Sequence, residues 1–172
     1  MVQPIKSKED IQRVKEYLLT RPERFSGQNI RDYTIFVLGV NMYERCKDIL
    51  HLRFYNILDQ NGQLKECITI LRQKTGETIN IPMTPIVAEA LTLYFESLGG
   101  INYCDFVFPS RNNDAVGNNK AMTVGNFYKK MKKLESELEL NYSVGSLSMK
   151  KTGGRASISQ EDIDELHMNN QL

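Results

Sequence analysis

The chain has 172 residues, of which 41% are hydrophobic and 25% charged, and its net charge is +1. This length and composition favour one globular domain, spanning residues 1–172, with a single core. No stretch of the sequence has the uninterrupted apolar length of a membrane span, and the first residues lack the apolar run of a signal peptide, so we expect a cytoplasmic protein. The three cysteines are widely separated and form no CxxC pair. We therefore expect no disulfide framework, no metal and no cofactor.

Two helices are predicted in the first forty residues. Residues 7–10 resemble a capping box, and the apolar spacing that follows predicts an amphipathic helix over about 8–19. After a polar loop, residues 30–40 are apolar on nearly every side, which predicts a buried helix. Residues 47–52 predict a further short helix.

Arg45 stands directly after the buried helix. A desolvated guanidinium is costly unless anionic groups surround it. One interpretation is a structural ion pair with Glu44, Asp48 or another acid, and the other is a ligand for a phosphate group. Arg45 by itself does not decide between them.

The middle of the chain changes to the alternating period of strands. Residues 54–58, 66–73 and 78–82 predict a small three-stranded antiparallel sheet, with a first turn at 59–62. The second hairpin turns just after Gln73, which places Lys74 at its tip. A lysine at such a tip is most often simply solvated, but it can also reach into a groove or an active site.

Helices are predicted again in the second half. Thr84 and Pro85 begin one that ends at the glycine pair 99–100, and Thr123 caps a long one. Residues 145–152 begin another, which we expect the glycine pair 153–154 to interrupt before a last short helix.

The charges are unevenly distributed along this half. Basic residues crowd 120–155, and acidic residues crowd 161–165. On the long helix, Lys129, Lys130 and Lys133 are expected to point largely outward. A charge run of this type is usually a solvated face, although a local basic face is also compatible with contact to a phosphate backbone.

In this order the elements resemble the catalytic domain of the tyrosine recombinases, the phage integrase family, over residues 5–154. Residues 29–50 resemble the family's helix and its Gly-Leu-Arg-x-Ser-Asp/Glu-Leu box. Residues 74–83 resemble the hairpin with the catalytic lysine, 106–110 the Leu-Phe-Pro segment, and 148–152 the second box, normally His-x-Leu-Arg-Lys-Thr. The resemblance implies an α+β, mainly α, fold carrying the small sheet predicted above.

The resemblance also implies a chemistry centred on one phosphodiester. In that family a tyrosine attacks the DNA phosphate, two arginines neutralise the nonbridging oxygens, and a lysine protonates the leaving oxygen. The matching positions here are Arg45 for the first arginine, Lys74 for the lysine and Lys150 for the second arginine.

Several positions depart from the family pattern. Tyr43 and Glu44 stand where the family usually has glycine and leucine, and both changes disfavour an anion beside Arg45. Leu147 replaces the histidine of the second box. Lys150 keeps the positive charge of the second arginine but cannot make its bidentate contact.

Two larger departures concern the ends of the sequence. The last tyrosine, Tyr142, precedes the second box, and His167 lies among acidic residues without the family's Gly-His context. The family's N-terminal core-binding domain is also not represented. We therefore expect this chain alone not to cleave DNA.

The leading hypothesis is an integrase-like DNA-binding protein from a mobile element, a pseudoenzyme that acts in regulation or as an accessory factor. Its expected partners are double-stranded DNA, bound with modest affinity, and another recombinase-like chain. The first alternative is a site-specific recombinase whose tyrosine comes in trans or from a longer chain. The second is a protein-interaction module in which residues 161–165 dock on a basic patch. The DNA contacts are expected at Arg45, Lys74, Lys129, Lys130, Lys133, Lys150 and Lys151.

Overall fold

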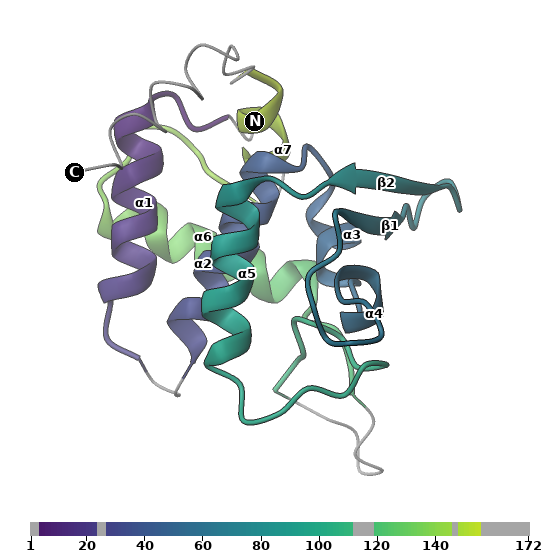
Figure 1. Cartoon of the computed structure of the whole chain (residues 1–172). Coiled ribbons are helices and arrows are strands. Elements are labelled where there is room, and N and C mark those ends of the chain that lie inside the picture. The colour runs from purple at the N-terminus through teal and green to yellow at the C-terminus, as the bar shows by residue number, and fades with distance from the viewer. Residues whose placement is uncertain (1–3, 24–26, 112–118, 146–147, 156–172) are drawn as a thin grey trace, which may run out of the picture.

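The computed structural model describes residues 4–23, 27–111, 119–145 and 148–155 (Figure 1). This part of the chain is mainly helical, with one two-stranded antiparallel sheet beside the helices. No helix in the described ranges is both long and apolar enough to cross a membrane.

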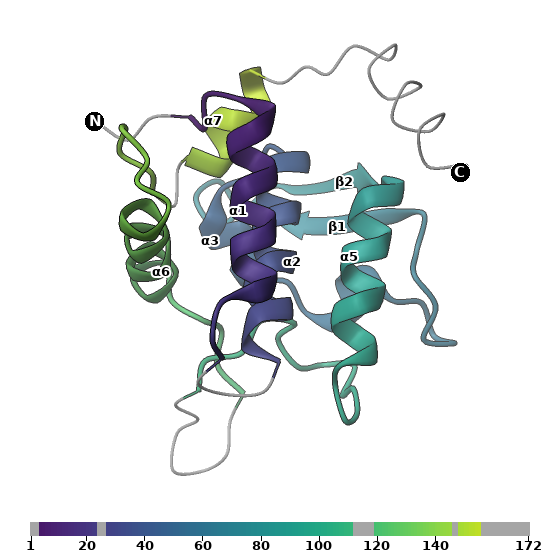
Figure 2. The ribbon, with the colours of Figure 1, turned by 90° about the vertical axis from the view of Figure 1, so that its left-hand side faces the viewer.

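The two N-terminal helices form as their sequence signals predict. Helix α1 spans Lys8–Thr20, and the Ser7 hydroxyl accepts the Asp10 N–H at 3.0 Å, which satisfies one of the free donors at the helix start. Helix α2 spans Gln28–Asn41 and is buried on most sides. It packs against α1, against α5 (Pro85–Glu96) and against α7 (Ser148–Arg155), so it is the centre of the fold. Figure 2 shows α1 in front of α2, with α5 and the strands to one side.

The sheet has two strands and not the three predicted. Strand β1 (Cys67–Leu71) pairs antiparallel with β2 (Thr78–Pro82), with Cys67 opposite Pro82. After the short helix α3 (Cys46–Leu50), the predicted strand at 54–58 is instead a single helical turn, α4 (Phe54–Ile57).

Local hydrogen bonds explain why α4 is helical. The Asn56 side chain accepts the Arg53 N–H at 2.8 Å, and the Leu58 N–H donates to the carbonyl of Phe54 at 2.8 Å. The apolar residues of this segment also follow the three- and four-residue spacing of a helix. Leu58 retains only an isolated bridge to Leu64.

The C-terminal half largely agrees with the prediction. Thr123 caps α6 (Val124–Glu137) by accepting the Asn126 N–H at 3.2 Å. Helix α7 continues to Arg155, so the glycine pair 153–154 does not interrupt it. The last predicted helix, the acidic residues 161–165 and His167 lie outside the described residues.

Helix α7 approaches α2 at a glycine. A Cβ atom on Gly39 would lie 2.8 Å from the Cβ of Met149, closer than side chains pack. Met149 is itself buried. Since Gly39 lies in the last turn of α2, α7 docks at the end of α2 from which the chain runs on to Arg45.

Candidate nucleic-acid interface

Arg45 is exposed and is the residue immediately before α3. The alternative of an ion pair with Glu44 or Asp48 is not seen in the described ranges, where Glu44 pairs with Arg72 and Asp48 accepts the Gln73 N–H. The structure therefore leaves the Arg45 guanidinium at the surface, where an anion from solution can reach it.

Glu44 pairs with Arg72 from the hairpin. The Arg72 Nη2 lies 2.7 Å from Glu44 Oε1 and its Nε 3.2 Å from Oε2, while its Nη1 lies 2.7 Å from Oε2 of Glu77. Hydrogen bonds to Glu44 and Glu77 raise the pKa of Arg72. Because Glu44 is neutralised in this way, it opposes an anion beside Arg45 less than its sequence position suggests.

Asp48 makes a second connection to the same hairpin. Its Oδ1 accepts the backbone N–H of Gln73 at 2.9 Å. Lys74 follows directly and is exposed at the tip, where Gly76 adopts a positive φ of 72° to close the turn. The two contacts place the hairpin with Lys74 next to the segment with Arg45.

Tyr43 has the backbone conformation of a glycine. Its φ is 56°, in the left-handed region that costs residues other than glycine roughly 1–2 kcal/mol. The side chain is 43% exposed, so burial of the ring does not explain the residue type. The backbone at Tyr43 thus has the left-handed conformation that glycine, the residue usual at this position of the family box, adopts without strain.

The second box is only partly described. Lys150 is half-buried and Lys151 is exposed, both on α7 next to Met149. Leu147, which the sequence resemblance predicts at the position of the family histidine, lies outside the described residues.

The lysines of α6 differ from one another. Lys129 and Lys133 are exposed, as predicted, but Lys130 is half-buried and its Nζ lies 2.6 Å from Oδ2 of Asp32. Burial lowers the pKa of Lys130, Asp32 opposes that change, and the nearby Arg31 and Arg21 add to it. The expectation that all three lysines point outward is therefore wrong for Lys130.

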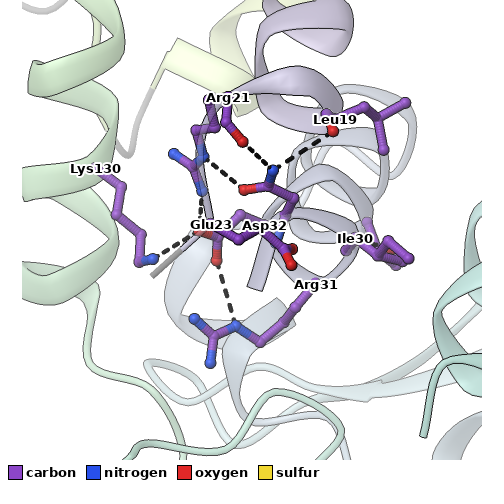
Figure 3. A network of polar contacts seen from close by, with 9 residues as sticks. Leu19, Arg21, Glu23, Ile30, Arg31, Asp32 and Lys130 are labelled. Carbon is purple, nitrogen blue, oxygen red and sulfur yellow. Dashed lines mark hydrogen bonds and ion pairs between the residues drawn. The ribbon is translucent and has the colours of Figure 1, made fainter. Parts of the chain in front are cut away.

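Asp32 is fully buried and binds three cations (Figure 3). Besides Lys130, Arg21 approaches its Oδ2 at 2.5 Å and Arg31 its Oδ1 at 3.3 Å. Arg21 also donates to the side-chain oxygen of Asn29 at 2.9 Å. The carboxylate therefore fixes basic side chains from three separate segments of the chain.

A cavity of about 510 Å³ opens over this network. Its lining includes Ser110, Asn126 and a set of basic residues, namely Arg21, Arg31, Arg111, Lys129, Lys130 and Lys133. The sequence reading missed the three arginines. Asp32 could have predicted them, because a carboxylate within a buried apolar helix requires cationic partners.

The cavity and Arg45 lie at opposite ends of α2. Arg31 is in its first turn, whereas Arg45 comes four positions after its last residue, Asn41, and the ten steps from Arg31 to Asn41 rise about 15 Å at 1.5 Å per residue. Within the described ranges, no group of three His, Cys, Asp or Glu side chains is placed to hold a metal ion.

Solved recombinase structures share this fold. The catalytic core of lambda integrase matches with a TM-score of 0.65 at 14% identity, covering 98% of this chain and 90% of that one. XerA recombinase matches with a TM-score of 0.67 at 13% identity, covering 96% of this chain and 54% of that one. XerH recombinase bound to its difH substrate matches with a TM-score of 0.63 at 16% identity, covering 99% of this chain and 47% of that one. The chain thus spans about half the length of the XerA and XerH chains.

One curated relative is similar in sequence. The probable integrase/recombinase YoeC of Bacillus subtilis (strain 168) is 41% identical over 61 residues, which are 36% of this chain and 30% of the relative. No family model matches the chain. The element order, the hairpin beside the arginine segment and the matching structures together show that this chain has the fold of the tyrosine recombinase catalytic domain.

Proposed function

We propose that this chain binds double-stranded DNA with an integrase fold and does not cleave it, acting as a regulator or accessory factor of a mobile element. The observation that carries the proposal is the pairing of the Arg45 segment with the Lys74 hairpin through Glu44, Arg72 and Asp48. These contacts join the two segments that carry the exposed Arg45 and Lys74, and charged hydrogen-bond donors of this kind are what a phosphate binds.

The similar structures support duplex DNA as the ligand. Lambda integrase residues 75–356 and XerH are described as bound to DNA and to the difH substrate, respectively. Their low identity to this chain makes the transfer a proposal. Arg45 and Lys74, together with exposed Lys129, Lys133 and Lys151, supply the positive charge that a DNA backbone needs.

The second box supports the absence of cleavage. Lys150 replaces a planar guanidinium with a point charge, so a bidentate contact to two phosphate oxygens is lost. Leu147 adds no hydrogen-bond donor where the family has histidine. Removing one such donor typically costs about 100- to 1000-fold in rate, and here two positions are changed.

Fluorescence anisotropy with a labelled duplex tests the binding. We expect affinity that weakens with salt, and the variants Arg45→Ala and Lys74→Ala should each reduce the slope of log K against log salt by about 1. A matched control is Lys65→Ala, which removes a lysine bonded to the carbonyl of Tyr55 and should leave the slope unchanged. Absence of binding at low salt would rule the proposal out.

A suicide substrate tests the absence of cleavage. We expect no covalent protein–DNA adduct with this chain alone. An adduct that forms when a second recombinase chain, or a longer version of this one, supplies a tyrosine would instead support the site-specific recombinase. Arg45 and Lys74 would then act on the scissile phosphate.

A further inference from the structure

Six basic residues line the cavity between α1, α2 and α6, and none of them is a position matched to the family's catalytic arginines or lysine. We infer that this cavity is a second phosphate-binding site, which takes backbone phosphates of a nucleic-acid strand at a distance from Arg45. The inference rests on the proposed function and adds a separate site to it.

Among the described residues that line the cavity, six are basic and none is acidic. Asp32, which contacts Arg21, Arg31 and Lys130, does not line it. The other nearby acid in Figure 3, Glu23, accepts the Asn29 N–H at 2.7 Å and does not line the cavity either. A concave surface with this excess of positive charge attracts anions strongly.

The cations are also held in place before a ligand arrives. Arg21 and Lys130 both contact Oδ2 of Asp32, and their side chains are only 11% and 20% exposed. A ligand therefore need not order these side chains, which removes part of the entropy cost of binding. Lys129 and Lys133 are exposed above them and one helical turn apart.

The spread of the cations favours a polymer over a single small anion. They come from the end of α1, the start of α2, the segment after Pro109 and the middle of α6. Lys129 and Lys133 alone are about 6 Å apart along the helix axis. A strand that carries one phosphate per about 3.4 Å of axis reaches several of these groups at once.

The test compares the double variant Lys129→Ala/Lys133→Ala with the unchanged chain in the duplex anisotropy assay. Each lost phosphate contact lowers the salt slope by about 0.9, so we expect a decrease of about 2. The matched control is Lys132→Ala on the same helix, whose Nζ contacts Glu135 and Ser143 and which does not line the cavity. It should keep the slope of the unchanged chain. Thermal unfolding of each variant verifies that it is folded.

Amide chemical shifts identify the ligand. The short duplex should shift the amide signals of Arg21, Arg31 and residues 129–133. Inorganic phosphate should shift the same signals only at much higher concentration. Tighter binding of inorganic phosphate than of the duplex would assign the cavity to a free anion and overturn the inference. Duplex binding that depends on Arg45 but neither shifts these amides nor responds to the double variant would also overturn it, while leaving DNA binding by the Arg45 and Lys74 segments in place. Failure of the duplex to bind at all would overturn both.

Discussion

The Arg72 guanidinium and the Glu44 carboxylate meet at two points, 2.7 and 3.2 Å, and so join the hairpin to the segment before α3. Glu44→Gln removes the charge of the buried partner and weakens both contacts. We expect faster hydrogen exchange of the amides of Gln73 to Glu77, by about tenfold, because this tip then opens locally more often. The more exposed Glu77→Gln is the control and should change exchange less. Equal effects of the two variants would show that Glu44 has no special part in holding the hairpin.

Tyr43 provides a test of backbone strain. Tyr43→Gly relieves a left-handed conformation that costs about 1–2 kcal/mol, less the roughly 0.5–1 kcal/mol entropy cost of glycine, so the free energy of unfolding should rise by about 0.5–1 kcal/mol. Tyr43→Ala removes the same side chain but keeps the strain. Denaturant unfolding should find the glycine variant more stable than the alanine variant, and equal stabilities would contradict the strain.

Gly39 is predicted to tolerate no side chain. In Gly39→Ala the new methyl group would overlap Met149, and overpacking of this kind costs about 1–3 kcal/mol. The matched control is Gly125→Ala in α6, where the nearest atom to a new Cβ is the Thr123 hydroxyl at 4.0 Å. That variant should be unchanged or more stable by up to about 1 kcal/mol. Thermal unfolding distinguishes the two, and an equally stable Gly39→Ala would contradict the close approach of α7.

Stability should fall at high pH because of buried phenols. Burial raises the pKa of Tyr94 to about 12, and its hydroxyl donates to the carbonyl of Val107 at 2.8 Å. The unfolded chain loses this proton near pH 10, so the contribution of Tyr94 is complete below that pH and is lost as the pH rises to about 12. Denaturant midpoints between pH 9 and 12 measure the loss.

Tyr94→Phe is the matching variant. It should be less stable at neutral pH by about 0.5–1.5 kcal/mol, since it lacks the hydrogen bond, but should lose less stability above pH 10. Burial also raises the pKa of the Tyr142 phenol to about 12. Because Tyr142 remains in the variant, part of the fall of the denaturant midpoint with pH remains too. If the denaturant midpoint of Tyr94→Phe fell with pH as steeply as that of the unchanged chain, Tyr94 would ionise as readily in the folded chain as in the unfolded one.

Periodicity and capping signals predicted most of the fold because they are local. Ser7 and Thr123 begin their helices as expected, and the hairpin of β1 and β2 follows from alternation and turn residues. The error at 54–58 arose because a five-residue segment with four apolar or aromatic side chains fits a strand or a helical turn equally well. The side chain of Asn56 decided the outcome.

Site residues could be predicted from the sequence only where they belong to a contiguous motif. The roles of Arg45 and Lys74 were predicted from their motifs and stay predictions, but the cavity needs Asp32 and Lys130, which are 98 residues apart. No rule of sequence spacing predicts a contact between residues so far apart in the chain. The partner of Glu44 was missed for the same reason, because Arg72 is 28 residues away and meets it only once the hairpin folds back.

The docking of Met149 on Gly39 also sets an order of events during synthesis. The two residues are about 110 positions apart. At about 5–20 residues per second, the ribosome completes α2 roughly 5–20 s before Met149 exists. During that interval the chain has already made both strands, of which β1 packs on α3 and α4, and α5, which packs on α2. The segments that carry Arg45 and Lys74 can thus pair before the helix with Lys150 is made.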